Sequence, residues 1–508
     1  MNQSTPATDL IDTKQLQTDI NVHFDYDPDL VFVQIHLTLV AYISGLVDAK
    51  RIEREIIQPL TQQAAITNST GIFTPEVMET DIFEAMIQGL LSGFVMIAEQ
   101  GRQKVMLANQ ASMPHRNIEQ LETESVVRGP REGFTEMLET NIALLRRRLK
   151  TDKLRMKTWQ IGTLSQTEVR LVYLDGIAEE NIVKEVVKRI GAIRIDAVLE
   201  SNYIEEMIRD HPFSLFPTME YTERPDVVAG ALLEGKVSIF TNNTPFVLIA
   251  PFTFWSAFQS SEDYYLTFTS ATFIRFIRAI SIMLALLLPS LYVAITTFHP
   301  EMLPTNLLLS VAGAREASPF PALVEALIME ITFEALREAI LRLPRIMGQT
   351  VSIVGGLVIG QAVVQAGIVS TPMVIVVSVT GIASFMIPRY NMTFSIRIMR
   401  LLLLILAGTL GFIGILLGLF ALAIYLTGVR SIGVPYLTPV APLSVIGLKD
   451  FLVRLPHWLL SRDPGQTEFK NKVRLPKNQR LAREPFDTFP PSLRPNKSEP
   501  PNEGKIPE

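Results

Sequence analysis

Residues Ala279 to Phe298, AISIMLALLLPSLYVAITTF, contain no charged side chain. An α-helix needs about 20 apolar residues to cross the hydrocarbon core of a bilayer, so this stretch predicts a membrane-spanning helix. Pro289 is compatible with the prediction, because neighbouring helices can cover the backbone carbonyl that a proline leaves free. Arg275 and Arg278 precede the stretch, which places this end of the helix in the cytoplasm by the positive-inside rule.

The helix lies in an apolar block that runs from about Ala279 to Tyr425. Of the 508 residues, 48% are hydrophobic and 19% are charged, and the mean hydropathy is +0.27. A soluble protein spreads its apolar residues over several cores, so one long apolar block excludes a wholly soluble protein. Three further membrane-spanning stretches are predicted, at 351–370, 373–387 and 401–426.

Charge and motif content exclude other classes of protein. A net charge of −5 provides no basic surface for nucleic acid. The absence of cysteine excludes disulfide scaffolds, thiolate metal sites and cysteine nucleophiles. The sequence has no GxxxxGK(S/T) phosphate loop, no HExxH helix and no GxSxG elbow, and its six histidines are scattered. We therefore expect a protein that is not an enzyme, without catalytic residues, metal or cofactor.

The sequence before the apolar block alternates charged residues with short apolar runs, which is typical of a globular α/β region. It does not open with a basic flank and an apolar core, so we expect no secretory signal and a cytoplasmic N-terminal region. The end of the chain, from about residue 462, is rich in proline and charge and is expected to be disordered. The predicted parts are a flexible N-terminus (1–29), a first α/β module with a connecting helix (30–150), a second α/β module (151–270), a multi-pass helical membrane domain (271–448) and a basic, proline-rich cytosolic tail (449–508).

Two pairs of segments indicate that the modules are related. Residues 39–48, LVAYISGLVD, parallel residues 169–179, VRLVYLDGIAE, since each joins a β-rich run and a glycine turn to a helix with an acidic start. Residues 90–97, LLSGFVMI, parallel residues 232–239, LLEGKVSI, where a helix ends at glycine and a strand follows. We favour duplication over chance and predict two strand–helix–helix–strand modules. Asn242-Asn243 predicts a hairpin turn in the second module.

A helix predicted between the modules ends in the basic run Arg146-Arg147-Arg148. Such a run could contact phosphate groups. We favour the other interpretation, a solvated face that the negative end of the helix dipole stabilises.

The stretch 323–341 differs from the other apolar segments because it carries ionisable residues. Glu330, Glu334, Arg337 and Glu338 fall within about 100° of one another on a helix. Ionisable groups at membrane depth are costly and usually face protein or water, so this helix either lines an aqueous path or pairs its acids with Arg337, Arg342 and Arg345. Both interpretations stay open. Candidates for the path are Glu330, Glu334 and Glu338, with Gln361 and Gln365 of the next predicted span.

The topology also stays open at this helix. If it lies flat at the interface, four spans return the C-terminus to the cytoplasm, but Arg389, Arg397 and Arg400 lie outside. If it crosses, those arginines lie inside and the basic tail is exported. We favour both termini inside, because the tail has more basic residues.

Small residues recur at close spacing in the predicted spans. Side chains this small let helix backbones approach closely, and helix packing in lipid depends on that contact. The pattern favours a multi-helix bundle or an oligomer. The residues are Gly356 and Gly360, Ala407 and Gly411, and Gly414 and Gly418.

Many motifs, in order, resemble the A subunits of GerA-type spore germinant receptors. The most specific is PFPALVEAL at 319–327, with Pro319 and Pro321, followed by 334–344. One departure is Asn242-Asn243, where the family usually has Asp-Gly; both dipeptides suit a turn that needs positive φ. The resemblance covers about 30–460. The other motifs are GPREGF at 129–134 (with Pro130, Arg131, Glu132 and Gly133), IDAVLES at 195–201, DHPFSLFPT at 210–218, TERPD at 222–226 (with Glu223, Arg224 and Pro225), TPFVLIAP at 244–251 and SEDYY at 261–265.

The resemblance implies a receptor subunit in the inner membrane of a bacterial endospore. It implies two partners, a transporter-like B subunit that binds the nutrient and a lipoprotein C subunit, and A subunits that form a homo-oligomer in contact with membrane lipid. In the family, this oligomer is thought to be a nutrient-gated ion channel that starts germination. An alternative is a non-conducting membrane scaffold that couples a nutrient-binding subunit to another channel. A secondary transporter is disfavoured, because no second half repeats the membrane block.

Overall fold

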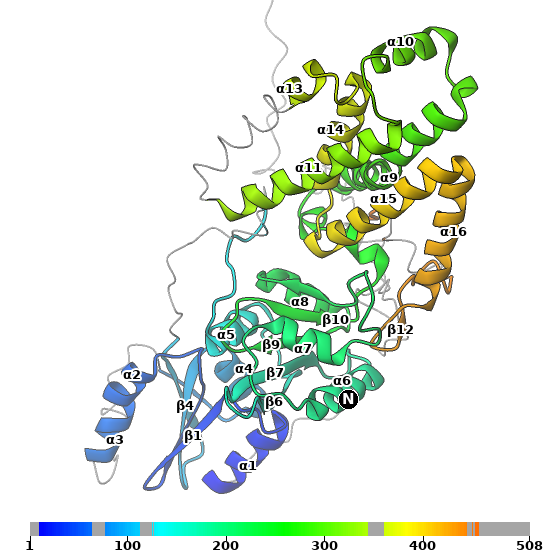
Figure 1. The fold of residues 1–508 in the computed structure, drawn as a ribbon. Coiled ribbons are helices and arrows are strands. Elements are labelled where there is room, and N and C mark those ends of the chain that lie inside the picture. The colour runs from blue at the N-terminus through cyan, green and yellow to red at the C-terminus, as the bar shows by residue number, and fades with distance from the viewer. Residues whose placement is uncertain are drawn as a thin grey trace, which may run out of the picture.

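Two α/β modules form one end of the molecule, and the apolar helices form the other (Figure 1). The structure is a computed structural model of the whole chain that describes residues 10–62, 77–111, 124, 126, 128–343, 360–443, 450 and 453–456. The fold class expected from the sequence is confirmed: an α/β region of two related modules precedes a helical membrane domain. The exact module boundaries stay a prediction.

The first module is a five-stranded sheet in the order β1-β2-β4-β5-β3, in which neighbouring strands pair antiparallel. Apolar side chains are buried on both faces of the sheet, where helices pack. Its strands are β1 (Leu30–Ile35), β2 (Thr38–Ile43), β3 (Val77–Thr80), β4 (Phe94–Glu99) and β5 (Val105–Asn109). Its helices are α1 (Thr13–His23), α2 (Ala49–Ile52), which continues as a π-helical turn (Glu53–Ile57) into α3 (Gln58–Gln62), and α4 (Phe83–Leu91).

The second module repeats this sheet with the equivalent order β6-β7-β9-β10-β8. The identical order extends the sequence parallels, because the segments paired above fall on β2 and β7 and on the junctions α4–β4 and α8–β9. The prediction of a single first strand was wrong: each module opens with an antiparallel hairpin, β1–β2 or β6–β7. The strands are β6 (Leu154–Ile161), β7 (Thr167–Leu174), β8 (Glu220–Thr222), β9 (Val237–Thr241) and β10 (Val247–Ala250), and the helices are α5 (Leu138–Arg148), α6 (Glu180–Ala192), α7 (Ser201–Ile208) and α8 (Pro225–Leu233).

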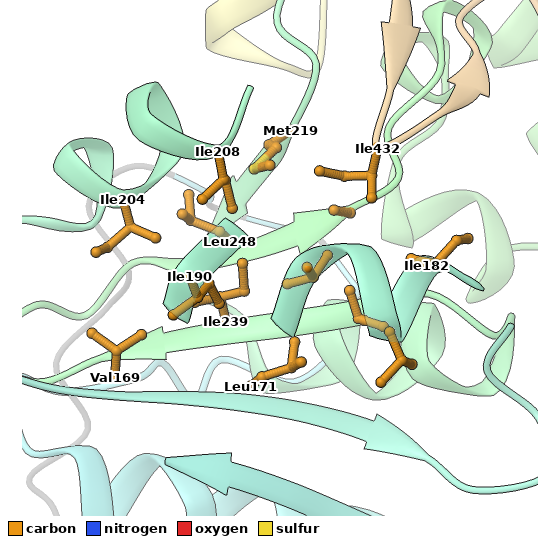
Figure 2. Packing of buried hydrophobic residues seen from close by; sticks show 14 of the residues in the cluster. Val169, Leu171, Ile182, Ile190, Ile204, Ile208, Met219, Ile239, Leu248 and Ile432 are labelled. Carbon is orange, nitrogen blue, oxygen red and sulfur yellow. The ribbon is translucent and has the colours of Figure 1, made fainter. Parts of the chain in front are cut away.

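Helices cover both faces of the second sheet, which explains why its central strand β9 is buried along its whole length. On one face, α6 and α7 pack Ile182, Ile190 and Ile208 against the sheet (Figure 2). The other face packs against α5 and α8. Ile432 enters the first of these cores from a short hairpin after the last helix, so the end of the helical domain returns to the second module (Figure 2).

Among the described residues of the helical domain, two helices, α9 and α15, are long and apolar enough to cross a membrane, and two shorter helices, α14 and α16, are also apolar. The predicted stretch 279–298 lies within α9, and 373–387 largely coincides with α14. The elements are α9 (Phe268–Phe298), α10 (Thr305–Arg315), α11 (Ala322–Arg342), α13 (Gly360–Gln365), α14 (Thr371–Phe385), α15 (Tyr390–Leu410), α16 (Phe412–Gly428), β11 (Arg430–Ser431) and β12 (Val434–Pro435). Residues 351–359 of the predicted span 351–370, with Gly356, lie outside the described residues.

The predicted single helix over 401–426 was wrong, because the chain reverses at Gly411. This glycine has a φ of 61°, a left-handed conformation that other residues avoid. α16 therefore folds back on α15. A side chain at Gly418 would contact Leu403 of α15, and one at Gly414 would meet the Leu406 carbonyl.

The other small residues behave differently from one another. Ala407 is fully buried with Ala294 and Ile415, as expected for a packing position. No atom of the described residues lies within 4 Å of where a side chain at Gly360 would begin, so close packing at this position is not seen in that part of the chain. Gly381 and Gly408, which the sequence pattern did not reveal, lie against Phe333 and Leu323 of α11.

Candidate functional site

The acidic face of α11 meets the basic face of α15 inside the helical domain, where the two helices are in contact. Glu330 and Arg400 form an ion pair with Oε2 and Nη2 2.5 Å apart, and each side chain is only 1% exposed. Glu334 lies 2.8 Å from Arg397 and 3.3 Å from both Arg337 and Arg400. We call these five residues the charge cluster. Each buried charge in it has an opposite charge nearby, as an apolar environment requires.

Aromatic and hydroxyl groups support the cluster from α11 and α14. The Arg337 guanidinium lies 4.9 Å from the ring centre of Phe333 and 5.0 Å from that of Phe385. It also donates a hydrogen bond to Ser384 Oγ at 2.9 Å. Ring faces attract cations, so Arg337 has favourable contacts on several sides and fixes α11 against α14.

The carboxylates of α11 become more exposed along the helix. The side chain of Glu330 is 1% exposed, that of Glu334 is 28% exposed and that of Glu338 is 60% exposed. Glu338 pairs with Arg342, which is itself exposed. The structure thus brings Glu330 and Glu334 together but leaves Glu338 at the surface. Gln361 and Gln365 lie on α13, where both are exposed, and they take no part in the ion pairs of the cluster.

The cluster shows the ion pairing expected under the second interpretation of α11, with Arg337 as an expected partner of Glu334 and with further partners from α15. Arg397 and Arg400 of α15 take the main role, whereas Arg342 pairs only with Glu338 and Arg345 lies outside the described residues.

Glu325, which the sequence pattern did not single out, fixes the start of α11. The helix begins after Pro321, and Glu325 in its first turn is fully buried. Its carboxylate accepts hydrogen bonds from the backbone N and the Oγ of Ser370, at 3.0 and 2.6 Å, and lies 3.7 Å from Arg315. Ser370 is the N-cap of α14, so this carboxylate joins the starts of α11 and α14 to the end of α10.

Arg389, directly before α15, connects the helical domain to the second module. It forms ion pairs with Glu220 of β8 and with Glu124, the latter at 3.3 Å. Glu124 also accepts a hydrogen bond from Thr222 Oγ1 at 2.7 Å. Burial raises the pKa of Glu124, and the charge of Arg389 opposes that shift. A cavity of about 420 Å³ opens beside these groups, lined in part by Tyr221.

A second connection lies at the start of α9. Arg275 contacts Asp263 at 2.9 Å and Asp450 at 2.8 Å, and Arg278 contacts Asp263 at 3.1 Å. Tyr264 Oη donates to Asp450 at 2.6 Å. The two arginines that precede the first predicted span therefore form buried ion pairs.

The sequence interpretation of Arg146–Arg148 as a solvated face is wrong for Arg146, which is buried. Arg146 is 2% exposed and pairs with Asp27 at 2.5 Å and Asp29 at 3.2 Å, while Arg170 of β7 pairs with Asp29 at 2.6 Å. Asp27 and Asp29 lie between α1 and β1 of the first module. Arg146 therefore joins the two modules, because its partners come from the other one.

The family motifs before α5 and α8 meet in space. Arg224 is buried and donates to the carbonyl of Pro130 at 3.1 Å and to Asp226 at 2.7 Å. The backbone N of Phe134 donates to the carbonyl of Glu223 at 2.7 Å. Glu132 contacts Arg147 and Arg148, and Pro225 is the first residue of α8. Arg131 is exposed and Gly133 is half-buried.

In the part of the chain that the structure describes, no group of three or more acidic or histidine side chains is placed to hold a metal.

This arrangement defines a protein in which a paired α/β region is tied by buried ion pairs to a domain of apolar helices with a charged interior. The family described as Bacillus/Clostridium GerA spore germination protein matches residues 18–466, and the chain belongs to this family.

Individual relatives agree with the family. The chain is 47% identical over 451 residues to the "Uncharacterized membrane protein YfkQ" of Bacillus subtilis, covering 86% of this chain and 88% of the relative. It is 45% identical over 456 residues to "Spore germination protein KA" of Bacillus subtilis, covering 88% and 83%. It is 39% identical over 449 residues to "Spore germination protein GerLA" of Bacillus cereus, covering 87% and 91%.

One solved structure is also similar, the crystal structure of the N-terminal domain of the A subunit of the Bacillus megaterium spore germinant receptor GerK3. It is 31% identical, and the match covers 47% of this chain and 94% of that domain with a TM-score of 0.37.

Proposed function

We propose that this chain is the A subunit of a nutrient-sensing receptor that starts endospore germination, and that copies of it assemble into a nutrient-gated, ion-conducting path. It acts in the inner spore membrane with its α/β region on the cytoplasmic side, together with a transporter-like B subunit and a lipoprotein C subunit. Membership of the GerA family supports the role in germination. The acidic face of α11 supports the conducting role.

The increasing exposure of the α11 carboxylates is the observation that carries the proposal. Glu330 is neutralised within one chain by Arg400, but Glu334 is 28% exposed and Glu338 is 60% exposed. Both outer carboxylates pair with arginines of the same chain, but their exposed surface can still face water or a second copy, as ionised groups at membrane depth do. Several copies that turn this face toward a common axis would provide both. A row of carboxylates there would select cations.

The test is cation flux through the reconstituted receptor. The A subunit with its partners is placed in liposomes, and the nutrient-triggered current is recorded in K⁺ and Cl⁻ gradients. Glu338→Gln and Glu334→Gln keep the side-chain size and remove the charge, and both should lower the preference for cations over anions. Glu180→Gln, on the exposed side of α6 in the second module, is the matched control and should change nothing. An unchanged reversal potential in both α11 variants removes this face from any conducting path.

A second function is supported by the connection through Arg389. Arg389 contacts Glu220 and Glu124 of the α/β region, and Arg397 and Arg400 on the same helix contact the α11 carboxylates. α15 could therefore transmit a movement of the second module to α11 in a subunit that conducts nothing itself. Receptor liposomes that bind nutrient but show no current would favour this transducer role.

A further inference from the structure

The loop between α7 and β8 leaves one aromatic ring almost uncovered. Phe213 is 98% exposed, whereas Phe216, three residues later, is 2% exposed and packs in a core with Phe252. Leu215 is also exposed. Exposing a large apolar ring to water on a loop that is otherwise held in place is unfavourable, which indicates that the ring contacts another surface.

Hydrogen bonds fix this loop against the ends of two apolar helices. The backbone N of Leu215 donates to Tyr425 Oη at 3.3 Å, and Tyr425 Oη donates to Ser214 Oγ at 3.1 Å. Ser395 Oγ donates to the carbonyl of Leu215 at 2.5 Å. Tyr425 lies in the last turn of α16 and Ser395 lies near the start of α15. The loop is therefore held where both helices emerge toward the α/β modules.

Other exposed aromatic side chains occur at the same helix ends. Tyr390 and Phe394, in the first turns of α15, and Tyr425 of α16 are all exposed by 40% or more. Aromatic side chains concentrate where membrane helices meet the headgroup layer. Phe213 and Leu215 belong to this group by position, although they come from the α/β region.

We propose that residues 211–217 form a membrane-interface anchor, with the Phe213 ring inserted into the headgroup region of the bilayer next to α15 and α16. The anchor holds the second module at a fixed depth, beside the connection through Arg389. It does not depend on whether the chain conducts ions.

The charges of the loop specify the kind of lipid surface. Asp210, directly before the loop, pairs with Arg189 at 2.6 Å, and residues 211–217 contain no lysine, arginine, aspartate or glutamate and one histidine, His211. The contact is therefore apolar, and we expect it to form on zwitterionic phosphatidylcholine without anionic lipid.

The absence of cysteine from the chain makes a site-specific test possible. Phe213→Cys and Leu37→Cys are each labelled with an environment-sensitive fluorophore, and the full chain is placed in phosphatidylcholine nanodiscs. Leu37 is the matched control, because it is 65% exposed but lies in the β1–β2 turn. The first module, to which this turn belongs, lies at the end of the molecule away from the apolar helices α15 and α16 (Figure 1). Depth is measured by quenching with lipids that carry a nitroxide near the headgroup.

Lipid quenching should be several-fold stronger at position 213 than at position 37 and unchanged when anionic lipid is added. Because Phe213 makes almost no contact within the chain, its replacement should leave the fold intact. Equal, weak lipid quenching at both positions overturns the anchor. A label at 213 that is shielded from water but not quenched by lipid also overturns it, since the ring then lies against protein, for instance a second copy.

Discussion

Replacing Arg400 by methionine tests whether the charge cluster is dry. The substitution removes the guanidinium 2.5 Å from Glu330, and it leaves a carboxylate with 1% exposure. Glu334 also loses a contact at 3.3 Å, but it keeps Arg397 at 2.8 Å. The loss therefore falls mainly on one carboxylate. Removing one partner of a buried pair costs about 3–5 kcal/mol, so we expect Arg400→Met to lower the free energy of unfolding by about 3 kcal/mol.

The double variant Glu330→Leu with Arg400→Met separates the pair from its packing. It removes both charges while filling similar volume, so its stability should lie within about 1 kcal/mol of the parent. Both variants are unfolded by SDS in mixed micelles, and the helical signal is followed by circular dichroism. Arg342→Met is the matched control, because its pair with Glu338 is exposed and should contribute about 0–1 kcal/mol.

One result would refute this reasoning. If Arg400→Met unfolds at the same SDS fraction as the parent, Glu330 does not depend on Arg400 for its stability. Water or a proton must then satisfy the carboxylate. That outcome would favour a hydrated α11 face and the aqueous path over the ion-paired interior.

Three further predictions concern other parts of the chain. Gly418→Ala places a Cβ 2.5 Å from Leu403 Cδ2 and should cost about 1–3 kcal/mol in the SDS assay, unlike Gly428→Ala, whose Cβ meets no atom of the described residues within 4 Å. Arg146→Met leaves Asp27 and Asp29 buried without their shared guanidinium and should cost about 3–5 kcal/mol, whereas the more exposed Arg147→Met should cost about 1 kcal/mol or less. Burial, followed by donation of its hydroxyl to Asp226, raises the pKa of Tyr265 from 10.0 to about 12. The folded state therefore keeps a proton that the unfolded state loses between those pH values, so stability falls as the pH rises through this window. Tyr265→Phe should reduce that fall, and an unchanged pH profile would contradict the assignment.

Local patterns in the sequence predicted much of the fold. Glycine turns followed by periodic helices located β2, β7 and the junctions before β4 and β9, because these features depend on neighbouring residues. The reversal at Gly411 was missed, because hydropathy is continuous across 401–426 and does not report a change of chain direction. Arg146 was misinterpreted for a different reason. Its partner Asp27 lies 119 residues away, and nothing in the run of three arginines distinguishes the buried one.

The partners of the α11 carboxylates in the charge cluster could be predicted from the sequence only in part. The need for partners of Glu330 and Glu334 follows from the cost of isolated charges in an apolar environment, and pairing was one of the two interpretations that the sequence left open. The identity of the partners depends on which helix lies beside α11, and nearby arginines of its own segment were the default expectation. Yet Arg397 and Arg400 are three residues apart on α15, and Glu330 and Glu334 are four apart on α11, so each pair lies on one face of its helix. When two such helices pack face to face, the carboxylates of one can form ion pairs with the guanidinium groups of the other. Complementary charge spacing is therefore a signal in the sequence that selects α15 as the partner of α11.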